Sequence, residues 1–518
     1  MNLIHRRNMG FPQRLGMTAC MALLLLPEPA PAVSIEKRSQ TVIEDSEEPL
    51  ARRIYSYAID TDSTGQLHIL YSKPVPGQDR CEIIYATGTA TNLTTTILET
   101  DGKIGSISTS VIADKTGSVV HASYIKHQND PDTHLVYQTI EAGTPSAQHQ
   151  VARGGWHTRM QLDSSGKPVF VRENGKSLRM FRPGATEGTW DETSFAPSGH
   201  IQYRIANFAC DPVRNCFHVT YGDNAGTTNG APLHHFLYAS STDTVDWVAS
   251  TVDDSLTLWE LEFWTSMVLD PDGHPIVSMY KFAQYNGNYN TGTSLLLGHH
   301  DGTNWTTRRI VGYIPGETPP DHRAGMGGQL VMDESGSLYG AWDNSPDHPI
   351  DFDGEFGNIA MDHSETGSEW QSQFQVEPFS AEGYCRMAIH GTNLYLLALG
   401  HYADTKLYLI HLGIVRQWDA GYTDLGSGWR RLAGFGDYIP MGTDGWIWHN
   451  KHGFWYAPPD STPESTWFFS GDMGWLYTSR AIYPFLFRAD DTAWLWYNGS
   501  RNPRWFVNMG TGQWESRP

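Results

Sequence analysis

Side chains that could take part in sugar chemistry stand in a few short segments of this sequence. His200, Tyr203 and Arg204 lie close together, and His127 and His157 precede them. A polysaccharide lyase needs a cation to neutralise a uronate carboxylate, a base to remove the adjacent carbon-bound proton and an acid for the leaving oxygen. His, Tyr and Arg could fill all three roles, so these five residues are candidate catalytic residues.

Carboxylates offer a second kind of chemistry. A glycosidase needs two carboxylates at a fixed separation. Glu260 and Glu262 would project from one face of a strand, because side chains alternate along it, and Asp321 or Glu382 would be the distant partner. The sequence therefore leaves a polysaccharide lyase and a glycoside hydrolase open as alternatives.

Closely spaced acids also suggest a cation site. Asp351, Asp353 and Glu355 offer the oxygen ligands that Ca²⁺ prefers, although their order differs from that of an EF-hand. The acidic segments 60–62 and 270–273 fit turns better. Ca²⁺ is the one cofactor that the sequence suggests.

A recurring hairpin would position these residues. In the segment 264–280 an apolar run ends at Asp270, turns through Gly273 and resumes as a second apolar run, which predicts strand, tight turn, strand. Six more copies recur at intervals of roughly 50 to 60 residues, and five of the seven keep Asp-x-x-Gly at the turn. The other six turns begin at Asp62, Asp114, Asp163, Asp211, Asp333 and His390. This spacing fits a unit of four short strands, the size of a propeller blade.

Outer strands follow the hairpins. A second apolar segment comes after most of them, and a tryptophan such as Trp190, Trp247 or Trp305 often follows it. We therefore predict an all-β fold with a seven-bladed β-propeller over residues 51–418, with six or eight blades as the alternatives. The segment 33–50 could supply a strand that closes the last blade.

Propeller geometry places function on one face. The recurring turns would share a face, so the loops before each first strand and after each second strand would build the opposite one, and loops on a rigid scaffold commonly carry sites. We place activity there, at the third to fifth blades, around Arg204. Further polar residues in these loops are Lys126, Asp130, His134, Asp321, His322, Arg323, Glu382, Tyr384, Arg386 and His401.

The composition is acidic and rich in aromatic residues. The chain has a formal net charge of −21, with 18% charged and 12% aromatic residues. Because phosphate binding needs a basic surface, nucleic acids and anionic membranes are excluded as general partners. An acidic polysaccharide would be repelled too, unless a local cluster of Arg and His received it.

The N-terminus and the cysteines predict an exported protein. Arginines precede an apolar run at 17–26, and small residues follow at 30–32, which is the pattern of a signal peptide over 1–32 and not of a membrane span. Cys210 and Cys216 flank the turn of the fourth hairpin, so we predict a disulfide between them.

Two more cysteines follow residue 32. Cys81 and Cys385 would pair if the first and last blades are neighbours, and two buried thiols are the equal alternative. The oligomeric state is left open by the sequence.

The composition changes near Trp429. The last 90 residues hold 10 of the 19 tryptophans, in short runs beside Gly or Pro, which predicts a separate β module over 425–518. Runs such as 474–477 and 502–506 resemble the aromatic-rich C-terminal modules of secreted proteins from Gram-negative bacteria. This resemblance implies a secreted, periplasmic or cell-surface location. The tryptophans either form the core of a small domain or leave rings exposed for stacking on sugars.

The repeated blades resemble the BNR-type repeat propellers of secreted bacterial proteins, a group that includes ulvan-type polysaccharide lyases with His, Tyr and Arg in a central cleft. The resemblance implies a lyase or hydrolase that acts on an extracellular, uronate-containing polysaccharide. In those lyases one His commonly begins a first strand and another follows the paired second strand. His127 fits the second position, whereas Ser106 or Ser108 stands near the first. The competing interpretation is a non-catalytic propeller whose loop-rich face binds a glycan or a protein.

Overall fold

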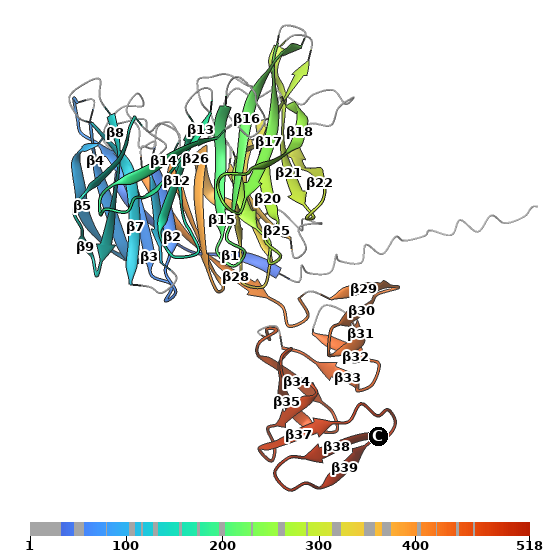
Figure 1. The fold of residues 1–518 in the computed structure, drawn as a ribbon. Helices are drawn as coiled ribbons and strands as arrows, with labels where there is room; N and C mark the ends of the chain where they lie inside the picture. Colours follow the sequence, from blue (N-terminus) through green and yellow to red (C-terminus); the bar gives the residue numbers. More distant parts are fainter. Residues whose placement is uncertain are drawn as a thin grey trace, which may run out of the picture.

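The chain is all-β wherever the structure describes it. The computed structural model describes residues 33–45, 56–78, 80–102, 109–114, 118–127, 133–154, 158–173, 177–195, 203–228, 231–256, 265–285, 288–312, 323–345, 358–364, 374–400, 406–420, 422–441, 445–458 and 461–518. These ranges form strands β1 to β39 and no helix (Figure 1), which confirms the all-β prediction. A helix long and apolar enough to cross a membrane is accordingly not found in them.

The paired strands run antiparallel, and most pairs join strands that are consecutive in sequence. The first are β2 (Tyr57–Thr61), β3 (Leu67–Pro74), β4 (Cys81–Thr89), β5 (Asn92–Gly102), β6 (Ser110–Ala113), β7 (Val119–His127), β8 (Thr133–Glu141), β9 (Thr144–Pro145) and β10 (His149–Arg153). Both β9 and β10 pair with β8, and β5 meets β7 only at the residue pair Gly102 and Lys126.

Three four-stranded sheets follow. They are built from β11 (Thr158–Leu162), β12 (Pro168–Glu173), β13 (Leu178–Pro183), β14 (Trp190–Phe195); β15 (Tyr203–Asp211), β16 (Cys216–Thr228), β17 (Ala231–Ser241), β18 (Val248–Leu256); and β19 (Ser266–Leu269), β20 (Pro275–Tyr285), β21 (Asn288–His300), β22 (Trp305–Gly312).

The last sheet of this part joins the two ends of its sequence. Its strands are β23 (Arg323–Met332), β24 (Leu338–Ser345), β25 (Asn358–Ser364), β26 (Phe374–His390), β27 (Asn393–Gly400), β28 (Lys406–Arg416) and the N-terminal β1 (Val33–Asp45). The long β26 pairs with β25 through its first residues and with β27 through its last ones. The first strand of the chain, β1, pairs with β28 along its whole length.

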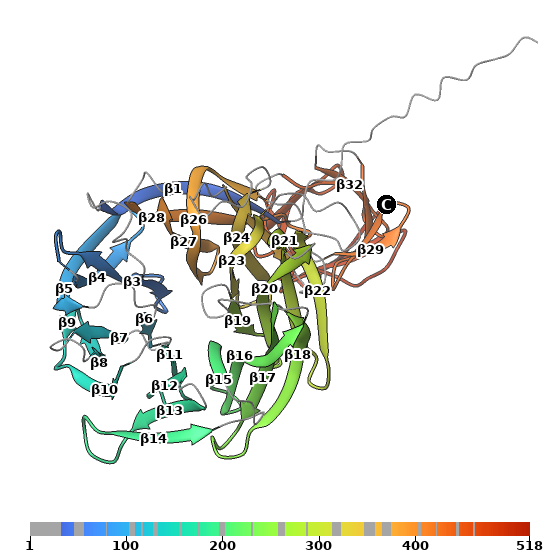
Figure 2. The ribbon, with the colours of Figure 1, turned by 90° about the horizontal axis from the view of Figure 1, so that it is seen from above.

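The inner strands, which are the first strands of the repeated hairpins, surround a common centre (Figure 2). Neighbours around this ring are, in cyclic order, β2, β6, β11, β15, β19, β23, β26 and again β2. Side chains tie adjacent inner strands together, because Asp60 Oδ2 accepts the Ala113 N–H at 2.9 Å and Thr61 Oγ1 donates to the Ile389 carbonyl at 3.1 Å. The sheets are therefore held side by side at the centre as well as by apolar packing further out.

The predicted Asp-x-x-Gly turns are confirmed where they are described. In each, the Asp Oδ1 accepts the backbone N–H four residues further on, at 2.8 to 3.0 Å. The glycines, which are Gly65, Gly166, Gly273 and Gly336, have φ between +75 and +84. Only glycine adopts such angles without strain, and this explains why the motif keeps it.

A buried histidine recurs in the second strand of three of the repeated hairpins. Its Nδ1 lies 2.6 to 2.7 Å from the hydroxyl of a tyrosine in the next strand. The pairs are His68 with Tyr85, His121 with Tyr137 and His218 with Tyr238. Burial lowers the pKa of all three histidines, so each sits in the apolar core as a neutral ring.

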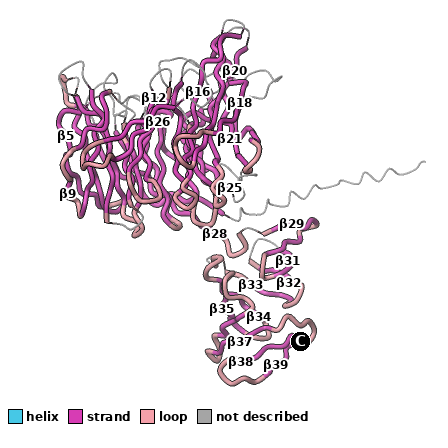
Figure 3. The backbone as a smooth tube through the Cα atoms, viewed as in Figure 1, coloured by secondary structure: helices cyan, strands magenta, loops and turns pink. Residues whose placement is uncertain are grey.

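The C-terminal residues form a sheet of their own, a continuous meander below the ring (Figure 3). Its strands are β29 (Thr423–Gly426), β30 (Trp429–Leu432), β31 (Gly436–Pro440), β32 (Trp446–His449), β33 (Gly453–Tyr456), β34 (Thr466–Ser470), β35 (Gly474–Thr478), β36 (Phe485–Arg488), β37 (Ala493–Tyr497), β38 (Arg504–Asn508) and β39 (Trp514–Arg517). They enclose an aromatic core of their own around Trp455, Phe468 and Phe506.

The predicted disulfide is wrong. Cys210 and Cys216 are free thiols. Cys210 stands opposite Phe217, and Cys216 stands opposite Asp211, so the two cysteines are out of register by one residue. Because neighbouring residues of a strand point to opposite faces, their side chains diverge. The other pairing is not formed either, since Cys81 and Cys385 are buried in different core clusters.

Candidate functional site

Most of the predicted site residues lie outside the described part of the chain. These are His157, His200, Glu260, Glu262, Asp351, Asp353 and Glu355. Tyr203 and Arg204 open β15, opposite Asp223 and Gly222, but their side chains are not among those described. Of the predicted catalytic residues, His127 alone has a described side chain. The grouping of these residues on one face thus stays a prediction.

His127 is the last residue of β7 and is half-buried. Side chains alternate along a strand. Ile125, two residues earlier, packs with residues of β11 and β12, so His127 points toward the sheet of β11 to β14. Tyr124 packs with residues of β3 and β4, so Tyr124 and Lys126 lie on the side of β7 that faces these two strands. His127 is therefore on the opposite side of β7 from the polar cluster that Lys126 forms.

A buried carboxylate of β5 binds Lys126 of the neighbouring strand β7. Glu99 of β5 is 8% exposed, and its Oε2 lies 2.5 Å from Lys126 Nζ. Gln148 donates to the same oxygen at 3.1 Å, and the N–H groups of Thr100 and Asp101 donate to Oε1 at 2.9 and 3.0 Å. Burial raises the pKa of Glu99, but these hydrogen bonds outweigh burial and hold the pKa below its usual value. Lys126 is therefore already neutralised, which makes it a poor receptor for a free anion.

Two polar atoms beside this ion pair have no hydrogen-bond partner in the structure. Tyr124 is fully buried two residues before Lys126, on the same face of β7, and its hydroxyl is unpaired. His134 stands opposite Lys126, and its buried Nδ1 is also unpaired. Unpaired buried polar groups are costly and therefore rare in proteins. This end of β7 is a candidate contact point on the predicted functional face.

A cavity of about 210 Å³ lies at the centre of the ring. Every inner strand contributes to its lining, and one contributing residue in each strand stands four positions before the residue that begins the turn. Since side chains alternate along a strand, this position defines one layer that faces the centre. The layer consists of Ala58, Ser110, Arg159, Asn207, Ser266, Gln329 and Arg386.

Arginines are the only ionisable side chains in the described lining of this cavity. Arg159 belongs to β11 and Arg386 to β26, with two inner strands between them on one side of the ring and three on the other. Arg386 donates to the Cys385 carbonyl at 3.0 Å. A guanidinium pairs with carboxylates and sulfates through two parallel hydrogen bonds. The cavity therefore suits an anion, although the chain as a whole carries a charge of −21.

A second pocket, of about 390 Å³, lies on the turn face and is acidic. Its lining includes Asp60, Asp62, Asp333, Glu334 and His390. The three aspartates accept backbone N–H groups at 2.9 to 3.0 Å, so they hold the turns and inner strands in place. An anion would be repelled from this end and would reach the arginines from the loop-rich face.

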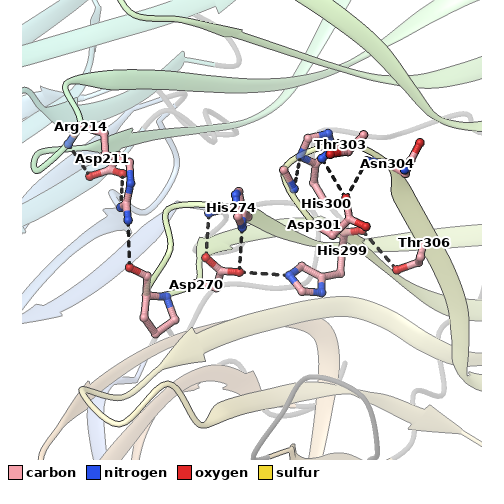
Figure 4. Close-up of polar contacts among 12 residues, drawn as sticks. Asp211, Arg214, Asp270, His274, His299, His300, Asp301, Thr303, Asn304 and Thr306 are labelled. Carbon is pink, nitrogen blue, oxygen red and sulfur yellow. Dashed lines mark hydrogen bonds and ion pairs between the residues drawn. The ribbon is translucent and has the colours of Figure 1, made fainter.

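The Asp270 turn is crowded by imidazoles and is not arranged around a cation (Figure 4). Asp270 Oδ2 lies 3.1 Å from His299 Nε2 and 3.5 Å from His274 Nδ1, while Oδ1 accepts the His274 N–H at 2.8 Å. In the adjacent turn Arg214 donates to Asp211 at 2.9 Å. Across the described residues no group of three or more His, Cys, Asp or Glu could hold a metal ion. The segment 270–273 thus acts as a turn, as the sequence predicts.

Two residues of this arrangement escaped sequence analysis. Arg159 lies inside strand β11, whereas the predicted catalytic residues were assigned to the loops that enter and leave the strands. Its signal was positional, because it stands four residues before the turn at Asp163, just as Arg386 stands four before His390. Glu99 is an outer-strand acid whose partner, Lys126, is distant in sequence, and no local pattern marks it.

Comparison with known proteins gives distant likenesses in structure only. No protein-family model matches the sequence, and no curated protein matches it. The structure is similar to the polysaccharide lyase Uly1, with a TM-score of 0.48 and 10% identity over 73% of this chain and 99% of that one. It is also similar to a PL25 ulvan lyase (TM-score 0.43, 10% identity, 73% and 95% covered) and to Penicillium chrysogenum α-L-arabinanase (TM-score 0.40, 11% identity, 73% and 98% covered). TM-scores below 0.5 at such identities assign the chain to no family.

Proposed function

We propose that residues 33–416 form a closed, seven-bladed β-propeller that acts on an acidic extracellular polysaccharide at its central cavity. The blades would be β2 to β5, β6 to β10, β11 to β14, β15 to β18, β19 to β22, then β23 to β25 with the first part of β26, and finally the rest of β26 with β27, β28 and β1. The pairing of β1 with β28 and the cyclic order of the inner strands support this arrangement. A strand from the chain start then closes the last blade.

The observation that carries the functional proposal is the pair of arginines at the centre. Arg159 and Arg386 both line the cavity, and two guanidinium groups there would form the local cationic cluster that an acidic glycan needs on an otherwise acidic protein. The cavity is smaller than the usual range for drug-sized ligands, roughly 300 to 1,000 Å³. It would take one acidic sugar, or the carboxylate or sulfate of that sugar, and the rest of the chain would lie in the loop-rich face.

Among the two enzyme classes, the geometry favours a lyase. A glycosidase needs two carboxylates at the scissile bond, and the described lining has none. A lyase needs a cation against the uronate carboxylate, which the arginines supply, and a base from the loop-rich face. His127, His157, His200, Tyr203 and Arg204 are the candidates that the sequence offers.

His157 is the first of these to test. It precedes Arg159 by two residues, and residues two apart point the same way if a strand continues.

Binding without catalysis is the second candidate function. The described lining contains no His, Tyr, Lys, Asp or Glu that could move a proton. A propeller whose arginines hold an acidic glycan and whose loops supply no base would be a binding protein. The same residues would then matter for affinity, and no product would form.

One experiment separates these functions. The protein is incubated with uronate-containing and sulfated polysaccharides, and unsaturated products are followed by ultraviolet absorbance, new reducing ends by a colour assay and binding by affinity electrophoresis. We expect Arg159→Ala and Arg386→Ala to lower activity or affinity roughly 10- to 100-fold, as loss of a charged hydrogen bond implies. Arg179→Ala is the matched control, because Arg179 pairs with Glu192 on outer strands.

The readings have distinct meanings. Unsaturated products identify a lyase, reducing ends alone identify a hydrolase, and arginine-dependent retention with neither identifies a binding protein. Full activity and retention in both cavity variants, or no effect of any acidic glycan, would overturn the proposal.

Export and Ca²⁺ binding belong to the same proposal. The pattern at 1–32 supports secretion or a periplasmic or cell-surface location in a Gram-negative bacterium. Asp351, Asp353 and Glu355 are the proposed Ca²⁺ ligands. If they bind Ca²⁺, chelation should lower the melting temperature of the protein, and Asp353→Ala should remove that effect.

A further inference from the structure

We propose that the β module, β29 to β39, binds an uncharged polysaccharide through its exposed aromatic side chains. This is a second site, and it does not depend on the function proposed for the central cavity. The module is the strand meander that follows the ring in sequence, and it has its own core.

Strand alternation gives the module two different faces. In β32, Ile447 is buried while Trp446 and Trp448 are exposed. In β37, Leu495 is buried, and Trp494 is exposed. Since neighbouring residues point to opposite faces of a sheet, Ile447 and Leu495 join the core of these two strands, while Trp446, Trp448 and Trp494 face outward. The core is complete without these exposed rings.

The kind of exposed side chain differs between the two parts of the protein. Before residue 417, the described large hydrophobic side chains that are exposed are Val42, Ile97, Val213, Val245 and Val248, and none of them is aromatic. In the module they are Leu425, Met441, Trp446, Trp448, Phe454, Trp475, Phe485, Trp494, Trp505, Met509 and Trp514, and eight of these eleven are aromatic. The module presents planar rings specifically.

Neighbouring rings form rows across the strands. Ring centroids are 5.4 Å apart for Trp446 and Tyr456, 6.4 Å for Tyr456 and Trp475, and 5.4 Å for Trp475 and Phe469. Each ring is thus braced by a neighbour and keeps part of its surface free; Trp475 is 38% exposed. Braced rings lose little conformational entropy when a ligand stacks on them.

A second row lies at the end of the chain. The Trp514 ring is 6.4 Å from Trp496 and 6.3 Å from Trp505. Two rows of rings on successive strands offer contacts that repeat in space, as the units of a polymer do.

The charge of the module indicates a neutral partner. Residues 422–518 contain eight basic and nine acidic side chains, so nearly all of the net charge of −21 belongs to the rest of the chain. The basic groups are largely occupied: Arg431 pairs with Asp437 at 2.6 Å, and Arg488 pairs with Asp491 at 2.6 Å and with Glu515 at 2.8 Å. A nucleic acid, an anionic membrane or a polyuronate would find no basic surface here.

These features together fit a neutral glycan. The flat face of a hexopyranose with equatorial hydroxyl groups carries axial C–H bonds, which are attracted to the negative face of an aromatic ring, while its hydroxyl groups stay in water. A lipid surface would be served as well by aliphatic side chains. We therefore infer a β-linked neutral hexose polymer as the ligand.

The test uses the full-length protein. It is sedimented with insoluble cellulose and chitin and run through gels that contain soluble β-glucan or glucomannan. We expect retention on at least one neutral polymer, and expect Trp475→Ala and Trp494→Ala each to weaken it roughly 3- to 10-fold, with a larger loss in the double variant. Trp475→Phe should keep most of the affinity. Met441→Ala and Met509→Ala, which alter exposed aliphatic side chains of the same module, should have no effect, and neither should Arg386→Ala at the cavity.

Several results would overturn the proposal. These are an absence of retention on every neutral polymer, retention that the double variant keeps, or retention on anionic polymers or lipid vesicles alone. A dimer in solution that Trp475→Ala dissociates, without glycan binding, would instead assign the aromatic face to a second copy of the chain. Equal melting temperatures of wild type and variants exclude unfolding as the cause of a loss.

Discussion

The buried histidines make the ring acid-sensitive, and His218 allows the effect to be measured at one site. His218 of β16 is 4% exposed, its Nδ1 lies 2.7 Å from the Tyr238 hydroxyl, and its Nε2 is unpaired. Its pKa is lowered from 6.5 to about 4, chiefly by burial; Asp211 opposes this shift, and His274 and His300 add to it. The folded protein thus holds the neutral ring.

The sign and size of the effect follow from linkage. A histidine whose pKa is lowered by folding binds protons more readily in the unfolded chain, so its contribution to stability is complete above pH 6.5 and is lost as the pH falls from 6.5 to about 4. One pKa unit corresponds to about 1.4 kcal/mol, so this site alone accounts for a loss of roughly 3 kcal/mol across that window. A loss of this size is a large fraction of the stability of a typical domain, about 5 to 15 kcal/mol.

The variant His218→Gln tests this reasoning. Glutamine does not titrate, and its amide can still bond Tyr238, so part of the local hydrogen bonding is kept. Urea unfolding is measured at several pH values between about 7.5 and 4.5. The ring is followed through the fluorescence of the nine tryptophans that precede Trp429, Trp247 and Trp305 among them, after the module tryptophans have been replaced by phenylalanine where tolerated. We expect the variant to be less stable than wild type at neutral pH and to approach or exceed wild type near pH 4.5.

The control and the contrary result are equally specific. His149→Gln changes a half-buried histidine of the outer strand β10 and should leave the pH dependence of stability as in wild type. If His218→Gln shows the full wild-type loss between pH 6.5 and 4, the pKa of His218 is not depressed, and its burial is not what makes the ring acid-sensitive.

Three further predictions concern the turns, the thiols and the buried ion pair. Gly273→Ala should cost at least about 1 kcal/mol more than Gly166→Ala in thermal unfolding, because both glycines have positive φ but a Cβ at 273 would lie 2.3 Å from Asp211 Oδ2 whereas one at 166 meets nothing; equal costs would contradict this. A reducing agent should leave the melting temperature unchanged. Cys210, whose pKa burial raises to about 12, should react slowly with iodoacetamide. A peptide mass that corresponds to a disulfide between Cys210 and Cys216 would show that the two thiols pair. Glu99→Gln should destabilise the protein by about 1 to 3 kcal/mol because it leaves Lys126 without its buried partner, while Glu192→Gln at the exposed pair with Arg179 should cost less than about 1 kcal/mol; similar costs would show that burial of Glu99 is unimportant.

The repeated hairpins were predictable because their signals are local. An Asp and a Gly at fixed spacing between two apolar runs determine a turn through backbone angles and through the Asp Oδ1 hydrogen bonds, all within five residues. The outer strands were predictable because an apolar segment follows most hairpins at a similar distance in sequence. The change in composition at Trp429 predicts a separate β module, and strands β29 to β39 lie in that part of the chain.

What could not be predicted depends on register between distant strands. The Cys210 and Cys216 prediction used closeness in sequence, but a shift of one residue places the two side chains on opposite faces. Glu99 meets Lys126 because β5 and β7, which are separated in sequence by β6, lie next to each other in the fold. Arg159 carries a signal that becomes visible once each inner strand is counted back from its turn, since the repeat then aligns it with Arg386.

The distribution of charge lets both proposed sites work in one protein. The ring is acidic as a whole, and the proposal gives an acidic glycan the cavity lined by Arg159 and Arg386 as its binding place, so charge would guide the glycan there. The module carries almost no net charge, so it neither attracts that polyanion nor repels a neutral chain. Stacking on rings depends little on ionic strength, whereas an arginine contact with a carboxylate weakens as salt is added. The module could therefore hold the protein on a neutral matrix while its cavity exchanges an acidic component, because the two contacts draw on different physical forces.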